Sequence, residues 1–273
     1  MASTSASSFH YQHRDETGDQ GTSYRFPPPP GYSQATTTTR DGLDIASLPL
    51  GSLVLVTAAN SYLALHITDQ LLQHGFRVRG AVRTASKAVR TAKLFRDRYG
   101  AGSYTTAVIP DMAAQHAFDI AVRGCAGVVH VASVTIPSTD PHEVITPSIA
   151  GALNAVEAAA KEPGVRRVVV TSCVSAAVGS DRRAIRDVVD GESWNLSDFE
   201  NAWGAPTMLG DRSGNARMVA AVAASSKMQA EQAVWKWYAQ RRPDFVLNTG
   251  KLLRPFLRAG RLTLELCSKR SFV

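Results

Sequence analysis

A chain of 273 residues that is 44% hydrophobic and 19% charged has enough apolar residues for a large core, which excludes a wholly disordered protein. It has no apolar run long enough to span a membrane, and its cysteines (Cys125, Cys173 and Cys267) have no metal-ligand spacing and favour a reducing, cytoplasmic setting. The net charge is +7. Its basic residues are scattered over the central domain or lie in a basic C-terminal tail that has no interleaved aromatic residues. We therefore expect no nucleic-acid partner.

Residues 1–48 are predicted to be a disordered extension. They are rich in Ser, Thr, Gln and Gly, contain the runs Pro27–Pro30 and Thr36–Thr39, and show no apolar periodicity. The proline run favours a stiff linker over a polyproline ligand. We therefore expect the folded domain to cover residues 49–248.

Strands and helices alternate through this domain. Short apolar runs predict strands at residues 52–57, 77–83, 104–109, 127–132, 165–173 and 244–247. Helical spacing of apolar residues predicts helices over residues 62–74, 87–99, 113–123, 141–161 and 220–240. Repeated β-α units of this kind predict an α/β fold with a Rossmann-like, doubly wound parallel sheet and helices on both faces. Ligands of such sheets bind at the carboxyl ends of the strands.

The turn after the first strand is where dinucleotide-binding folds place glycines, for a tight turn and for close approach of the pyrophosphate. Here Ala58, Ser61 and Ala64 occupy the three glycine positions, and all are small. The amides at the start of the next helix still face the expected phosphates. By itself this turn is a weak signal. The cofactor-binding residues that it predicts are Thr57, Ala58, Asn60, Ser61, Tyr62 and Leu63.

The second strand ends at Arg83, and Lys87 follows four residues later. Dinucleotide folds that prefer NAD commonly have an acidic residue here for the ribose hydroxyls, whereas an arginine accommodates a 2′-phosphate. Arg83 therefore favours NADP as the cofactor, with an ordinary surface arginine as the plainer alternative.

Further motifs follow in order along the chain. They are Pro110–Met112, His130–Ser133, Asp140–Pro141, Gly151–Asn154, Val168–Ser172, Glu192–Asn195 and Ala224–Lys227. With residues 56–64 and 78–83, this order resembles the extended short-chain dehydrogenase/reductases, in the branch of dihydroflavonol, cinnamoyl-CoA and fungal aldehyde or ketone reductases. The resemblance covers residues 50–248. It implies reduction of a carbonyl on a small organic molecule, in a secondary-metabolite pathway. The NADP contacts that it implies beyond the turn are Arg83, Lys87, Asp111, Met112, Val131, Ala132, Ser133 and Lys227.

The resemblance also implies a catalytic tyrosine, a lysine four residues later on the same helix face, and a serine at the end of the fifth strand. Lys227 matches the lysine, but Ala223 stands where the tyrosine belongs. Cys173 occupies the serine position, where a thiol is a poorer hydrogen-bond donor. Ser172 or Ser175 compensates only if the strand end is shifted. Because loss of a general acid costs about 10²–10⁴-fold in rate, we predict slow turnover with Lys227, Cys173 and Ser172 as catalytic candidates. For Cys173, a structural role is favoured over a nucleophilic role.

Residues 249–273 depart from the family pattern. The family continues here into a substrate-binding lobe, whereas this chain has a basic tail without the family's motifs, and a truncation or altered reading frame near Thr249 is our hypothesis. Three functional hypotheses follow: an NADP-dependent reductase of a ketone or aldehyde, a non-catalytic NADP-binding sensor or partner protein, and a product with neither activity nor tight cofactor binding.

Overall fold

A computed structural model describes residues 48–179, 193–204 and 212–252 of the chain. All of them belong to one compact unit. The predicted disordered extension and most of the predicted tail lie outside these described residues.

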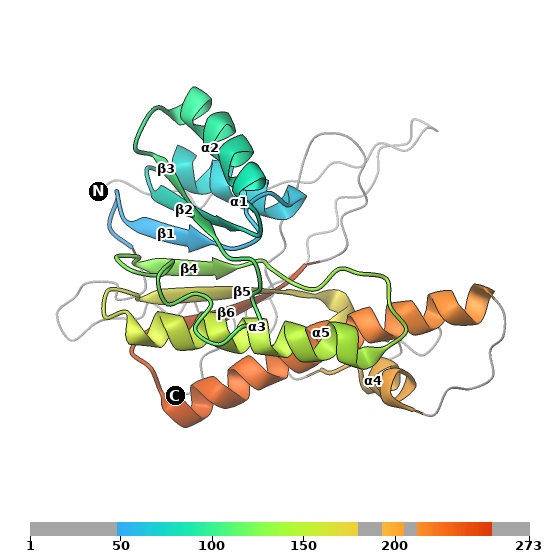
Figure 1. The fold of residues 1–273 in the computed structure, drawn as a ribbon. Coiled ribbons are helices and arrows are strands. Elements are labelled where there is room, and N and C mark those ends of the chain that lie inside the picture. The colour runs from blue at the N-terminus through green and yellow to red at the C-terminus, as the bar shows by residue number, and fades with distance from the viewer. Residues whose placement is uncertain (1–47, 180–192, 205–211, 253–273) are drawn as a thin grey trace, which may run out of the picture. The chain divides into compact units, whose positions relative to one another are not determined.

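The centre of this unit is a parallel sheet of six strands (Figure 1). The strands are β1 Leu53–Val56, β2 Arg77–Val82, β3 Tyr104–Val108, β4 Gly127–His130, β5 Arg167–Cys173 and β6 Val246–Leu252. Their spatial order is β3-β2-β1-β4-β5-β6, and every neighbouring pair is parallel. This is the doubly wound Rossmann order, so the predicted fold class is confirmed.

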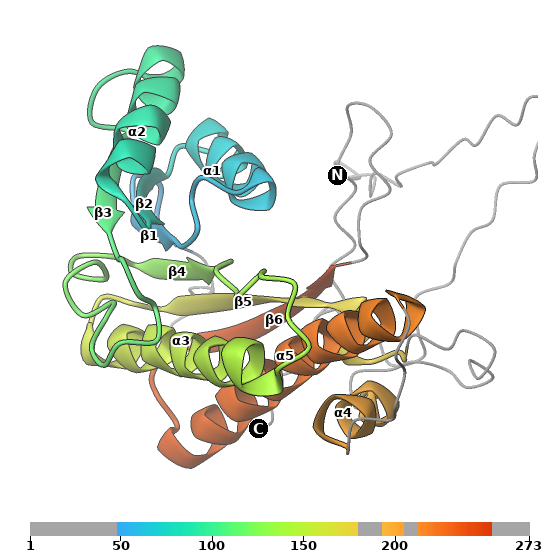
Figure 2. The ribbon, with the colours of Figure 1, turned by 45° about the vertical axis from the view of Figure 1, so that its right-hand side comes forward.

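Helices cover the sheet from both sides (Figure 2). They are α1 Tyr62–Gln73, α2 Ala85–Tyr99, α3 Pro141–Lys161, α4 Leu196–Trp203 and α5 Arg212–Arg241, with the short 3₁₀ helix η1 Val174–Ala176 after β5. Residues of α1 and α2 pack in one core cluster and residues of α3 and α5 in another, on the opposite face. Among the helices of the described part, none combines the length and the apolar character that a membrane crossing needs.

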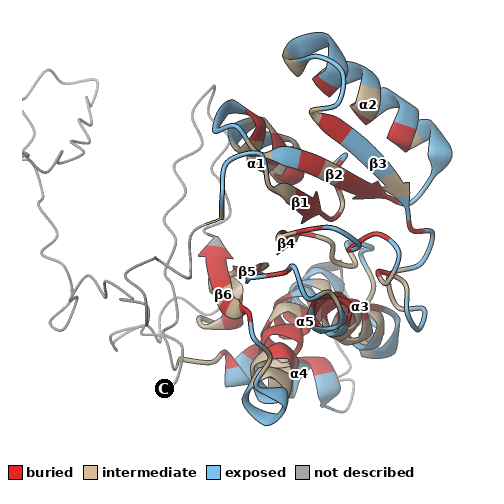
Figure 3. Cartoon of the chain, turned by 90° about the vertical axis from the view of Figure 1, so that its left-hand side faces the viewer, coloured by how far each residue is buried: buried red, intermediate tan, exposed pale blue. Residues whose placement is uncertain are grey.

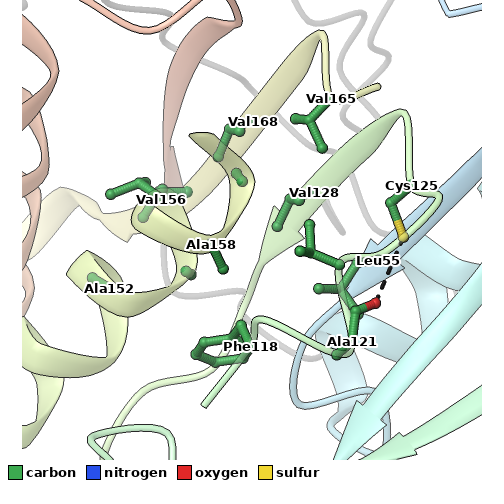
Figure 4. Packing of buried hydrophobic residues seen from close by; sticks show 14 of the residues in the cluster. Leu55, Phe118, Ala121, Cys125, Val128, Ala152, Val156, Ala158, Val165 and Val168 are labelled. Carbon is green, nitrogen blue, oxygen red and sulfur yellow. Dashed lines mark hydrogen bonds between the residues drawn. The ribbon is translucent and has the colours of Figure 1, made fainter. Parts of the chain in front are cut away.

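The core on the α3 and α5 side is built from alternate strand residues. Figure 4 shows Leu55 of β1, Val128 of β4 and Val168 of β5 in one cluster with Val156 of α3; each is at most 1% exposed. Because strands buried on both faces show near-continuous apolar runs, the short Val- and Leu-rich stretches were sufficient to predict them. Figure 3 shows buried residues along β1, β2 and β6 and exposed residues on the outer faces of the helices, whereas the edge strand β3 is largely exposed.

The helix predicted over residues 113–123 is wrong, because this segment is a series of turns. His116 has a φ of +65°, a left-handed conformation that interrupts a right-handed helix. The amide of Asp119 donates a hydrogen bond to the carbonyl oxygen of His116, which closes a turn. The Lys161 Nζ atom at the end of α3 lies 3.0 Å from His116 Nδ1 and 2.9 Å from the Asp119 carboxylate. The apolar spacing was nevertheless meaningful, since Phe118 and Val122 of the segment are buried in the core.

Three further elements differ from the expectation. Strand β6 continues through Leu252 and pairs with β5 over residues 249–252, so the boundary expected after Asn248 falls inside a strand. Helix α4 was not predicted; Asn195 caps its start by accepting a hydrogen bond from the amide of Asp198. Helix α5 also begins eight residues before the predicted start at Ala220.

Candidate dinucleotide and catalytic site

The candidate site lies where the strand order reverses, between the carboxyl ends of β1 and β4. The Thr57 hydroxyl oxygen, directly after β1, accepts hydrogen bonds from the amides of Val131 and Ala132 after β4, at 2.8 and 2.9 Å. Thr57 is 1% exposed. The structure therefore brings together two separate groups of predicted cofactor residues at the crevice where doubly wound folds bind ligands.

The turn from Thr57 to α1 is tight although it contains no glycine. Ala58 has a φ of +50°, a left-handed conformation that costs an alanine about 1–2 kcal/mol. Ser61 caps α1, and its side chain accepts from the amide of Ala64. The first turn of α1 contains no acidic residue, so the helix start is free to face an anion. Asn60 and Tyr62 are exposed beside it.

Arg83 and Lys87 lie at the carboxyl end of β2 and in the first turn of α2. Arg83 is exposed, and among the described residues no carboxylate pairs with its guanidinium. Because an unpaired guanidinium is well suited to a phosphate, this position stays compatible with a 2′-phosphate. Thr84 caps α2 by accepting from the amide of Lys87.

The loop after β3 is fixed to α3. The side-chain amide of Asn154 donates to the carbonyl oxygen of Met112 at 2.9 Å, and the Asp111 carboxylate accepts from the amide of Ala113. Met112 packs over Gly151 of α3, where a Cβ would lie 2.9 Å from the Met112 sulfur. This loop is therefore held rigidly at the same edge of the sheet as Thr57.

Lys227 lies on α5 and lines a small cavity with residues from β4, β5 and α3. Burial lowers the pKa of the Lys227 ammonium, while the nearby Cys173 and Glu231 oppose this effect. Ala223, one helical turn earlier, is exposed. The helix thus presents position 223 to solvent beside the lysine, but without a phenol.

The two other catalytic candidates have different surroundings. Ser172 is 4% exposed and its hydroxyl donates to the Glu231 carboxylate at 2.6 Å, so its proton is already engaged in the core. Cys173 is partly exposed and interacts electrostatically with Lys227. Cys173 is therefore the better placed of the two to meet a ligand. Cys125, in contrast, is buried, and burial raises the pKa of its thiol to about 11.

The NAD dependent epimerase/dehydratase family matches residues 54–196, which is more than half of the chain. The chain belongs to this family.

Several relatives of this chain are reductases by name. Aldehyde reductase 2 of Sporidiobolus salmonicolor is 42% identical over 76% of this chain and 58% of its own length. Ketoreductase adrE of Penicillium rubens is 33% identical over 76% of this chain and 60% of its own length. The chain thus spans less than two thirds of the length of these relatives. Their names confirm the predicted reductase branch.

Solved structures agree on the fold. The yeast methylglyoxal/isovaleraldehyde reductase Gre2, in complex with NADPH, superimposes with a TM-score of 0.61 over 74% of this chain and 57% of its own, at 24% identity. This likeness supports the Rossmann architecture of the epimerase/dehydratase family member described here.

Sequence reasoning assigned no role to three buried polar residues at this site: His130 of β4, Ser148 of α3 and Glu231 of α5. His130 was visible only as part of a motif, and Ser148 gives no signal in a helix of mixed composition. Glu231 had a usable signal, since it follows Lys227 by four residues and so lies on the same face of α5. A charged residue on an otherwise buried helix face indicates a polar partner in the core.

The buried His130 makes stability depend on acidity. Burial and the Lys227 charge lower the His130 pKa to about 3, against about 6.5 in the unfolded chain. Below pH 6.5 the unfolded chain binds a proton that the folded protein does not, so the free energy of unfolding falls as the pH falls. Between pH 6 and 4, we expect the free energy of unfolding to fall less steeply with falling pH in His130→Gln than in the wild type. The difference in slope should be up to about 1.4 kcal/mol per pH unit.

Urea unfolding followed by circular dichroism over this pH range measures the effect. His66→Gln is the matched control, because His66 is exposed on α1. Equal slopes of unfolding free energy against pH in the wild type and His130→Gln would contradict the burial of a neutral imidazole.

Proposed function

We propose that this chain binds NADPH at the carboxyl ends of β1, β2 and β4 and reduces the carbonyl group of a small aldehyde or ketone. The observation that carries the proposal is the convergence of Thr57, Ala132 and Lys227 at the switch point of the sheet: the Ala132 amide donates to Thr57, and Ala132 lines a cavity with Lys227. The family of this chain includes relatives named aldehyde reductase and ketoreductase. A cytoplasmic location and a role in secondary metabolism are parts of the proposal that rest on cysteine usage and on the resemblance alone.

The residues at this edge fit a dinucleotide. The small residues Ala58 and Ser61 leave the amides at the start of α1 accessible to a diphosphate, and Arg83 offers an unpaired guanidinium to a 2′-phosphate. Asp111 and Met112 border the same edge. When bound, NADPH supplies the hydride for carbonyl reduction.

The chain's own contribution is proton supply and orientation. The Lys227 ammonium, one helical turn after Ala223, is a proton donor near the position of the missing tyrosine. The thiol of Cys173 offers a weak hydrogen bond to the carbonyl oxygen. Neither group replaces a phenol held one turn before the lysine, so we expect reduction to be slow.

A non-catalytic NADP-binding protein is the second candidate, and the specific observation in its favour is Ala223. The groups that are expected to bind the cofactor do not include the missing tyrosine, so NADP binding does not require this proton donor. NADPH binding without turnover would support this alternative.

Calorimetric titration with NADPH and NADH tests the cofactor proposal directly. We expect NADPH to bind more tightly than NADH in the wild type, and Arg83→Ala to weaken NADPH binding about 10–100-fold, the range for loss of a charge-assisted hydrogen bond. NADH binding should change little, because NADH lacks the 2′-phosphate.

Arg90→Ala is the matched control, since Arg90 is another exposed arginine of α2. It should leave both affinities unchanged. If neither nucleotide binds the wild type, the proposed function is refuted; if Arg83→Ala and Arg90→Ala behave alike, the role of Arg83 is refuted.

A further inference from the structure

Lys251 of β6 is a buried charged residue that the proposed reaction does not use. It is 8% exposed and pairs with Ser172 of β5 across the sheet. Alternate residues of a strand point to the same face of a sheet, so Lys251 shares a face with Thr249, whose hydroxyl is bonded to Glu231 of α5. A buried ammonium is costly unless electron-rich groups surround it, and the neighbours of Lys251 therefore indicate its role.

Three electron-rich groups surround the Lys251 ammonium. Its Nζ atom lies 3.9 Å from the Glu231 carboxylate and donates to the carbonyl oxygen of Ser193 at 3.5 Å. It also lies 4.9 Å from the centre of the Trp194 ring, within the range of a cation–π interaction. The three groups come from α5 and from the segment that precedes α4, so they fix the ammonium where these elements meet the end of β6.

Lys227 is the second lysine beside Glu231. The two residues are four positions apart on α5 and thus lie on one face of the helix, and both line the same small cavity. The Glu231 charge favours the ammonium form of Lys227. One buried carboxylate therefore serves two lysines.

Hydrogen bonds hold the Glu231 carboxylate in place between them. Its Oε2 atom accepts from the Ser172 hydroxyl at 2.6 Å, and its Oε1 atom accepts from the Thr249 hydroxyl at 3.0 Å. Hydroxyls that donate to a carboxylate stabilise its negative charge. Lys251 approaches the Oε1 atom, so the carboxylate is oriented by β5 and β6 together and cannot turn wholly towards Lys227.

We propose that Lys251 is a positioning residue for Lys227: it shares the Glu231 carboxylate with Lys227, so that Lys227 releases its proton more readily. Lys251 acts through Glu231 and needs no contact with a carbonyl compound. The sharing of the carboxylate stands on this buried cluster alone. Its value for proton supply in carbonyl reduction rests on the proposed function.

The charged and titratable groups that face Lys227 set the direction of the effect. They are His130 from β4, Cys173 from β5 and Glu231 from α5, with Lys251 of β6 next to Glu231; the residues that α3 adds to the cavity lining, Ser148 and Ala152, carry no charge. Burial and the Lys227 charge lower the His130 pKa to about 3, so its ring is neutral. Without Lys251, one like charge is lost and the Glu231 charge acts on Lys227 alone. Both changes should raise the Lys227 pKa.

The titration of Lys227 in full-length protein labelled with ¹⁵N-lysine measures this effect by nuclear magnetic resonance. The Lys227 signal is assigned by its loss in Lys227→Met. The Lys227 pKa should rise by about one unit in Lys251→Met, tenfold in the protonation constant and at the low end of the effect of a neighbouring charge. It should stay unchanged in Lys251→Arg, which keeps the charge. Lys236→Met is the matched control and should also leave it unchanged, because Lys236 is exposed on α5.

A second pair of variants tests the same charge without an unbalanced carboxylate. Lys251→Met leaves Glu231 with one lysine fewer, which destabilises the core, whereas Glu231→Gln combined with Lys251→Met removes both charges. The Lys227 pKa should be higher in this double variant than in Glu231→Gln alone, because only the single variant retains the like charge of Lys251. If Lys251→Met does not fold, this pair decides. Lys227 titrations that do not respond to Lys251 in either background, or a Lys227 pKa that falls when Lys251 is removed, overturn the inference.

The pH profile of carbonyl reduction distinguishes positioning from a purely structural role. Because the Lys227 ammonium is the proposed proton donor, the rate should fall as the pH rises through the Lys227 pKa. This fall should move to higher pH in Lys251→Met and not in Lys236→Met, whereas a loss of packing alone lowers the rate without moving the profile. Because the titrations need neither NADPH nor turnover, a raised Lys227 pKa in a protein that binds no NADPH supports the inference while refuting the proposed function.

Discussion

Ala223→Tyr is expected to raise reductase activity by about 10²–10⁴-fold, the usual contribution of a positioned general acid. Ala223 is exposed on α5 and lies one helical turn before Lys227, so a phenol there projects on the same face as the ammonium. A nearby positive charge lowers the pKa of a phenol, which makes it a better proton donor at neutral pH. The measurement is NADPH oxidation in the presence of a panel of small aldehydes and ketones.

Ala239→Tyr is the matched control for this gain. Ala239 is another exposed alanine of α5, but it lies twelve residues beyond Lys227, about 18 Å along the helix. The control should leave the rate at the wild-type level. If Ala223→Tyr binds NADPH and still reduces no carbonyl compound faster than Ala239→Tyr, the site lacks more than its proton donor and the non-catalytic alternative is favoured.

The sheet was the most predictable part of this protein. Strands such as Leu53–Val56 are buried on both faces and therefore appear as continuous apolar runs. The segment around Phe118 shows the limit of the same reasoning. Its apolar spacing correctly indicated burial, but a left-handed residue, His116, and the ties from Lys161 decide that it forms turns. Local spacing reports which side chains are buried more reliably than the backbone conformation that buries them.

The candidate site divides in a similar way. Predicted cofactor residues such as Thr57 and Val131 follow the ends of neighbouring strands, so topology alone brings them together. The buried polar groups His130, Ser148 and Glu231 come from three different elements, and their contacts depend on how α3 and α5 pack against the sheet. No local pattern encodes that packing. The same packing gives Ser172 a partner in the core, which its position in the sequence does not indicate.

Glu231→Ala should produce the largest loss of stability. Glu231 is 1% exposed, and its carboxylate accepts hydrogen bonds from Ser172 at 2.6 Å and Thr249 at 3.0 Å. It also lies 3.9 Å from the Lys251 ammonium and favours the charged form of Lys227. Removing it leaves two buried hydroxyls unpaired and two lysines without their counter-charge. We expect the free energy of unfolding to fall by about 3–5 kcal/mol, the range for breaking a buried ion pair from one side.

Urea unfolding of Glu231→Ala beside Glu157→Ala measures this loss against a matched control. Glu157 is exposed on α3, so its removal should change the free energy of unfolding by less than about 0.5 kcal/mol. The free energy of unfolding of Glu231→Gln should lie between those of the two alanine variants. The amide carbonyl oxygen of the glutamine still accepts a hydrogen bond from one hydroxyl, but the negative charge is lost. Equal stabilities of Glu231→Ala and Glu157→Ala would mean that apolar packing around Met228 and Leu247, both at most 1% exposed, holds β5, β6 and α5 together. The buried carboxylate would then serve to set the charge of Lys227 rather than to stabilise the fold, and the Lys227 titration in Glu231→Gln would separate these two roles.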